Sequence, residues 1–167
     1  MADFVVLIVR GSIWIALAAF AAAHVGFRRT GRDPLQVPLT LYWMGAAFLL
    51  VHIVAVFHWH HDWSHARAVA ATAEETARVF GLDWGGGVWV NYAFLAGWVT
   101  DAWRRTHART QSPRVTAVGW TARAGALVVI FNGAIVFVPW PRSLAGMAIV
   151  AVLAWAWRGG VTRRRAG

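Results

Sequence analysis

Five apolar runs constrain this chain more than any other feature of its sequence. They cover roughly residues 4–27, 38–59, 88–103, 117–138 and 144–157. A helix needs about 20 apolar residues to cross the ~30 Å hydrocarbon core of a bilayer. All five runs reach or approach that length, although the third and fifth are short and contain Gly97 and Gly146. The runs predict an all-α, polytopic integral membrane protein, in which residues 1–167 form a single bundle of five transmembrane helices.

The composition agrees with a membrane protein and removes several kinds of chemistry. The chain is 59% hydrophobic, which is more than an ordinary soluble domain carries. It has no cysteine, so disulfides, thiolate metal sites and iron–sulfur clusters are excluded. All 16 basic residues are arginines, which excludes lysine-based covalent catalysis. The formal charge of +9 does not indicate nucleic-acid binding, because the arginines flank the apolar runs instead of forming a stripe on a soluble domain.

The positions of the arginines predict the orientation of the bundle. They concentrate after the first run, after the third run and at the C-terminus, whereas the other side carries most of the acidic residues. Cytoplasmic loops of membrane proteins are enriched in Arg and Lys. We therefore expect a bacterial inner-membrane protein with its N-terminus outside and its C-terminus in the cytoplasm. The predicted cytoplasmic arginines are Arg28, Arg29, Arg32, Arg104, Arg105, Arg109, Arg114, Arg158 and residues 163–165, and the outer ones are Arg67, Arg78 and Arg142.

One substantial segment is predicted to lie outside the bilayer, between the second and third runs. Residues 66–80 are rich in alanine and lack Gly and Pro, which favours a short extracytoplasmic helix. The sequence Thr72-Ala-Glu-Glu75 matches a capping box and predicts a fresh helix start there, and Gly81 is expected to end the helix. Residues 83–87 are then expected to turn the chain back toward the membrane.

Histidines concentrate where the second run ends. Four of the seven histidines fall in His58-Trp59-His60-His61-Asp62-Trp63-Ser64-His65, which we call the His rim. If this segment stays helical, residues three, four and seven apart share one face. Imidazoles one helical turn apart can bind a single ion. We therefore predict a divalent metal site made by His58, His61 and His65, with Glu74 or Glu75 as a further ligand.

The metal site has an enzymatic interpretation and two simpler alternatives. Neutral imidazole suits zinc or copper, which we prefer over iron. The pattern H-D-x-x-H at residues 61–65 is a relative of the zinc-protease H-E-x-x-H, so Asp62 is the candidate general base of a metal-dependent hydrolase or oxidoreductase. In the alternatives, the histidines pack beside tryptophans at the membrane interface without any ligand, or form a pH-responsive cluster.

Polar residues on four runs fall at similar depth below the His rim. Such groups are costly in hydrocarbon and usually face the bundle interior or a cavity, so we expect them to line a substrate pocket. A b-type haem held by His52 and a loop histidine is the alternative cofactor. A non-catalytic metal-binding or assembly subunit, docked to other membrane proteins or to a second copy, is the alternative function. The predicted pocket residues are Arg10, His52, Asn91, Tyr92 and Asn132.

A second polar set is predicted near the cytoplasmic face. It consists of His24, Asp101, His107 and Arg123. Asp101 and Arg123 fall at comparable depth on the third and fourth runs, which predicts an ion pair between them. The two histidines are expected to be exposed, with no role assigned to them or to His60.

Overall fold

The computed structural model describes residues 2–30, 36–107, 117–136, 140–141 and 143–162. Within these ranges the chain forms helices joined by short connections, without a strand, so the all-α prediction is confirmed. Several arginines used to predict the orientation lie outside the described residues, namely Arg32, Arg109, Arg114, Arg142 and residues 163–165. The elements are α1 (Ala2–Thr30), α2 (Gln36–His60), α3 (His65–Phe80), α4 (Gly87–His107), α5 (Ala117–Ile130), the π-helical segment η1 (Phe131–Val136) and α6 (Ser143–Thr162).

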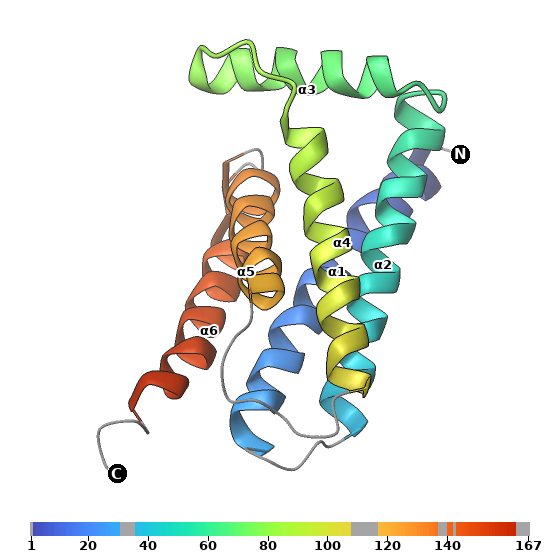
Figure 1. The fold of residues 1–167 in the computed structure, drawn as a ribbon. Helices are drawn as coiled ribbons and strands as arrows, with labels where there is room; N and C mark the ends of the chain where they lie inside the picture. Colours follow the sequence, from blue (N-terminus) through green and yellow to red (C-terminus); the bar gives the residue numbers. More distant parts are fainter. Residues whose placement is uncertain (1, 31–35, 108–116, 137–139, 142, 163–167) are drawn as a thin grey trace.

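The bundle consists of α1, α2, α4, α6 and α5 continued by η1, which we call the long helices. They run side by side, and α3 lies across one end of them (Figure 1). α1 packs along α2 and α6, and α4 packs against both α2 and α5. We call the end crossed by α3 the α3 end, and the end where α1 leads to α2 the opposite end. The first residues of α1 lie at the α3 end, and the last residues of α6 (Ser143–Thr162) lie toward the opposite end (Figure 1).

Three of the helices are long and apolar enough to cross a membrane. They cover Asp3–Arg29, Val37–His60 and Ala117–Ala134, and Ser143–Arg158 adds a shorter apolar helix. α4 has 21 residues but carries Asp101, Arg104 and Arg105 near its end, which makes it less apolar than the others. The five predicted runs therefore correspond in position to helices of the structure. Three of these helices also have the length and apolar character that a membrane span needs.

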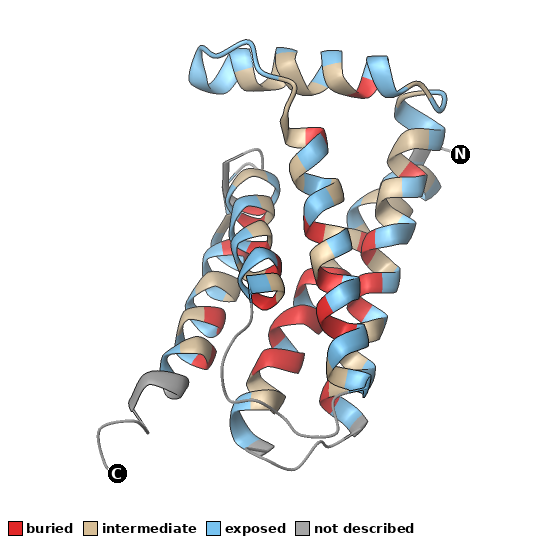
Figure 2. Cartoon of the chain, viewed as in Figure 1, coloured by how far each residue is buried: buried red, intermediate tan, exposed pale blue. Residues whose placement is uncertain are grey.

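An aromatic stack forms the core between α1, α2 and α4. Trp98 is completely buried, and its ring centroid lies 4.6 Å from that of Phe20, 5.3 Å from Phe94 and 5.5 Å from Tyr42. The Trp98 indole donates a hydrogen bond to the Tyr42 carbonyl at 3.1 Å, so its polar atom is satisfied. Figure 2 shows that the buried residues concentrate on the sides of α1, α2 and α4 that face one another. This stack sets the spacing of the three helices in the half of the bundle away from α3.

Glycines allow α1 and α2 to approach closely. A Cβ atom on Gly26 would lie 2.6 Å from Cγ of Pro38, and one on Gly45 would lie 3.1 Å from the Ala16 carbonyl oxygen. Small residues of this kind let helix backbones come close together. The α1–α2 hairpin is therefore tightly packed along its length.

Candidate functional site

The His rim is not a continuous helix. α2 ends at His60, and Asp62 and Trp63 adopt φ angles of 44° and 59°, in the left-handed region that a helix cannot pass through. The Ser64 side chain then accepts a hydrogen bond from the Arg67 backbone N–H at 3.3 Å and caps α3, which begins at His65. The expected helix over residues 66–80 is confirmed, and so is its end at Gly81, which has a left-handed φ of 69°. The expected fresh start at Thr72 is wrong, because the helix already begins at His65. The predicted shared helical face of the histidines does not form.

The histidines of the rim pack instead on aromatic rings. His58 accepts a hydrogen bond from the Trp63 indole at 3.2 Å, and its ring lies 5.2 Å from that of Trp59. His65 stacks on Tyr92 at 5.9 Å and lies 4.9 Å from the Trp89 ring. These contacts agree with the alternative in which the histidines pack beside interfacial aromatic residues.

The carboxylates near the rim are engaged in ion pairs at the surface. Asp62, the candidate general base, pairs with Arg67, and Glu75 pairs with Arg78. Across the described ranges, no group of three or more His, Cys, Asp or Glu side chains could hold a metal ion. The predicted ligand set of His58, His61, His65 and a glutamate is therefore not assembled in the structure. Glu74, one of the two candidate glutamates, is exposed.

Two of the predicted ligands do share a site. His61 and Glu75 line an open hollow of about 350 Å³ together with Ala71, Thr72 and Thr76 of α3. Partial burial lowers the pKa of His61, and the neighbouring His60 lowers it further. The imidazole of His61 is therefore neutral near pH 7, which is the form that binds metals.

The predicted pocket residues have different neighbours. His52 Nδ1 donates a hydrogen bond to the Val9 carbonyl of α1 at 2.8 Å, and the Tyr92 hydroxyl lies 3.3 Å from Nδ1 of His65. Arg10 and Asn91 are exposed, and Asn132 is half-buried on η1. The contacts of His52 and Tyr92 connect pairs of helices and do not join these residues to each other. Because Nδ1 of His52 already donates a hydrogen bond to Val9, only Nε2 could bind a haem iron.

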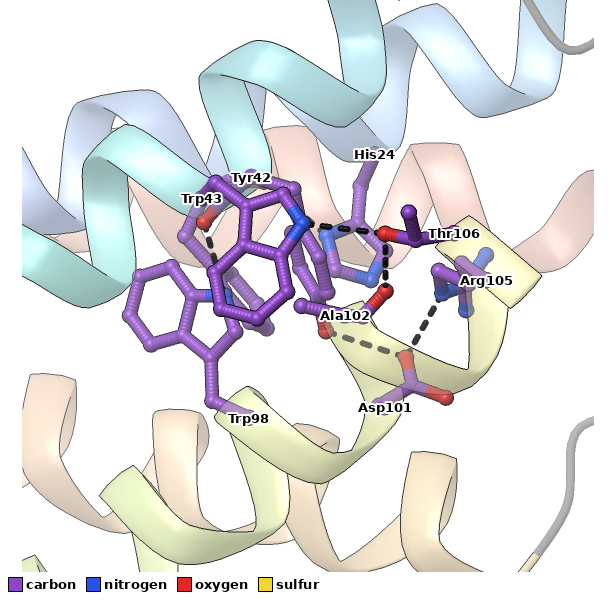
Figure 3. Close-up of polar contacts among 9 residues, drawn as sticks. His24, Tyr42, Trp43, Trp98, Asp101, Ala102, Arg105 and Thr106 are labelled. Atoms are coloured by element: carbon purple, nitrogen blue, oxygen red, sulfur yellow. Dashed lines mark hydrogen bonds and ion pairs between the residues drawn. The ribbon is translucent and has the colours of Figure 1, made fainter.

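A second polar cluster lies in the half of the bundle away from α3, and Figure 3 shows most of its members. The Tyr42 hydroxyl and Nε of Arg105 both donate to the same oxygen of Asp101, at 3.1 Å and 2.7 Å. Asp101 and His24 are each 4% exposed, and Tyr42 is 0% exposed. All five long helices contribute to this cluster, which we call the polar centre and which consists of His24, Tyr42, Asp101, Arg105, Arg123 and Trp157.

The polar centre corrects two expectations. The ion-pair partner of Asp101 is Arg105 on the same helix, because the i,i+4 spacing brings the two side chains together, and is not Arg123. His24 is buried, not exposed, and its Nδ1–H donates to the Phe20 carbonyl at 2.9 Å. His107 is exposed as expected and stacks on Trp103 at 4.3 Å.

Arg123 and Trp157 leave two N–H donors in the polar centre without an acceptor. The Arg123 guanidinium lies 5.2 Å from the Trp157 ring, and Nε of Arg123 and Nε1 of Trp157 are both buried without a hydrogen-bond partner in the described part of the chain. Leaving such a donor unsatisfied costs about 1–3 kcal/mol. One carboxylate, Asp101, faces two guanidiniums, and Arg123 interacts electrostatically with Arg105 and Asp101. The polar centre therefore has a surplus of positive charge and of donors.

Sequence reasoning missed Tyr42, Arg105 and Trp157 as members of this cluster. The Asp101–Arg105 spacing within one helix was an available signal, whereas the approach of Trp157 depends on how α6 packs against α1. No protein-family model, curated protein or solved structure matches this chain.

Proposed function

We propose that this protein crosses the membrane five times and binds an oxyanion-bearing ligand in its polar centre, within the cytoplasmic half of the bilayer. The N-terminus would lie outside and the C-terminus in the cytoplasm. The described arginines support this orientation, because those flanking the apolar runs gather at the opposite end of the bundle (Arg28, Arg29, Arg104, Arg105 and Arg158).

The observation that carries the proposal is the pair of buried donors, Nε of Arg123 and Nε1 of Trp157, beside an unbalanced guanidinium. Charged groups inside a membrane are costly and mark functional sites when they persist there. Asp101 balances Arg105 by direct contact, so the charge of Arg123 remains. A singly charged phosphate or carboxylate at Arg123 would balance this charge and accept both N–H groups. Guanidinium groups bind both of these anions strongly.

The ligand has two sources with the same chemistry, a lipid headgroup phosphate or a soluble phosphate. Arg123 is only partly buried, so a ligand can reach it from the surface of the bundle. Binding can be measured for phosphatidylglycerol by native mass spectrometry and for inorganic phosphate by equilibrium dialysis of the purified protein. Arg123→Gln is expected to weaken binding about tenfold, because it removes one charge-assisted contact, and Trp157→Phe roughly fivefold.

Arg29→Gln is the matched control, since it removes one arginine at the same end of the bundle from an exposed position. We expect it to leave the affinity nearly unchanged. Binding of the lipid alone identifies a headgroup site, and binding of phosphate alone identifies a solute site. Equal weakening by Arg123→Gln and Arg29→Gln would show general surface attraction and contradict the proposal, as would failure of both probes to bind.

The hollow at the α3 end favours a second candidate function, a divalent cation site in which zinc or copper binds His61 and Glu75, with water completing the coordination. The cation would have to displace Arg78, which pairs with the Glu75 carboxylate. Calorimetric titration with Zn²⁺ tests it. His61→Ala is expected to weaken binding at least tenfold, and His60→Ala, the exposed neighbour, by less than about twofold. Since the pKa of His61 is lowered from 6.5, binding should persist at pH 6.5 and be lost as the pH falls further. Equal binding by wild type and His61→Ala would rule out this site.

A further inference from the structure

α3 separates its polar and apolar residues onto opposite faces. At 100° per residue, Val69, Thr72, Thr76 and Val79 fall on one face, and Arg67, Glu74 and Arg78 fall on the other. The two threonines behave as apolar residues here, because their hydroxyls donate to the Ala68 and Thr72 carbonyls of the helix itself. Their methyl groups therefore remain to face an apolar environment.

The apolar face of α3 is covered along its first half. Ala68 is buried, and the turn before α4 packs closely there, since a Cβ on Gly85 would lie 2.5 Å from the Val69 carbonyl oxygen. Toward the end of the helix the same face is open, with Val79 41% exposed, and the following turn exposes Leu82 and Trp84 at 62% and 55%. Figure 1 shows that this part of α3 extends beyond the start of α4.

Exposed tryptophans surround α3 at the same end of the bundle. Trp59, Trp63, Trp89 and Trp140 are between 38% and 72% exposed, and they belong to or adjoin the ends of α2, α4 and α6. Indole rings concentrate at the headgroup level of a bilayer. α3 lies across the long helices at this level, so its axis runs along the plane of such a bilayer (Figure 1).

We propose that α3 lies in the outer lipid–water interface, with Val79, Leu82 and Trp84 inserted at the boundary between headgroups and acyl chains. The partner of this surface is zwitterionic lipid. Residues 61–84 contain four carboxylates, Asp62, Glu74, Glu75 and Asp83, against two guanidiniums, Arg67 and Arg78. Two of the carboxylates already pair with these arginines, so the segment has no positive charge to offer an anionic headgroup. This inference rests on the proposed membrane insertion and is independent of the anion site.

The absence of cysteine makes single-cysteine spin labelling of the full chain direct. Nitroxides at Val79→Cys and Leu82→Cys, in lipid nanodiscs, report the exposed apolar surface, and those at Ala70→Cys and Glu74→Cys report the water face. At the first pair, we expect the nitroxide to collide more often with oxygen than with a water-soluble nickel chelate. At the second pair, we expect it to collide more often with the nickel chelate. The values should be the same in zwitterionic lipid and in lipid with one third phosphatidylglycerol.

Val54→Cys, at an exposed apolar position in the second half of α2, is the reference for membrane insertion itself. If the nickel chelate reaches Val79→Cys as readily as Glu74→Cys while Val54→Cys stays oxygen-accessible, α3 lies in water and the inference is wrong. Protection of Val79→Cys from both reagents would show that protein covers this face, and it would also overturn the lipid assignment. Nickel access at Val54→Cys would instead remove the membrane insertion on which both proposals depend.

Discussion

Replacing Asp101 with alanine is expected to destabilise the protein by about 3 kcal/mol or more. The change leaves the guanidinium of Arg105 without its partner, close to Arg123, and removes the acceptor of the buried Tyr42 hydroxyl. Uncompensated charge in a buried site is among the most costly defects that a substitution can create. The free energy of unfolding in mixed micelles, measured by SDS titration with circular dichroism, gives the effect directly.

Two further variants identify the cause of this loss. Asp101→Asn keeps an acceptor for Tyr42 and removes only the charge, so a smaller loss is expected. Asp62→Ala breaks an ion pair between exposed side chains and should change stability little. If Asp101→Ala and Asp62→Ala have the same effect, the Asp101–Arg105 pair contributes no more than a surface ion pair, and our account of the polar centre is wrong.

Replacing Trp98 with alanine is expected to cost about 3–5 kcal/mol. The indole is 0% exposed, contacts the rings of Phe20, Phe94 and Tyr42, and donates to the Tyr42 carbonyl. Much of this cost comes from lost packing contacts and from the cavity left behind. The same SDS titration measures the loss.

Trp98→Phe keeps most of the ring contacts but loses the N–H donor. We expect its loss of stability to be roughly half of that caused by Trp98→Ala. Trp103→Ala, at a position 56% exposed on the same helix, is the control for removing a tryptophan from α4. A loss for Trp98→Ala no greater than that for Trp103→Ala would show that the aromatic stack does not hold the bundle together.

The positions of the long helices could be predicted from the sequence because apolar length requires no knowledge of packing. The end of α4 shows where this approach stops. The predicted run ends at residue 103, before the charged residues Arg104 and Arg105, yet the helix continues to His107. Arginine is a good helix former, so the helix continues beyond the apolar run, and Arg105 pairs with Asp101 one turn earlier. Apolar length registers neither effect.

The arrangement of the His rim depended on backbone conformation that the sequence did not reveal. Neither Gly nor Pro marks the end of α2. The residues with left-handed backbone are Asp62 and Trp63, and tryptophan rarely adopts this conformation. The available signal was Ser64, a common N-cap residue, immediately before an alanine-rich stretch. The capping box at Thr72 instead predicted a helix start later in the chain. The metal site of the full rim stays a prediction, with His61 and Glu75 as the ligands that share a hollow.

The polar centre depended on contacts between helices distant in sequence. The depth of Asp101 and Arg123 could be estimated from the runs, but the rotation of each helix about its axis could not. That rotation places the Tyr42 hydroxyl beside Asp101 and brings Arg123 against Trp157. Helices that are apolar all round give little indication of which side faces a neighbour.

Tyr42 belongs to both the aromatic stack and the polar centre. Its ring packs against Phe20 and Trp98, while its hydroxyl bonds to Asp101. A change in ring size at Phe20 or Trp98 would therefore also displace the phenol oxygen from the carboxylate. A substitution in the apolar interior at these positions is therefore expected to need a compensating substitution in the polar centre.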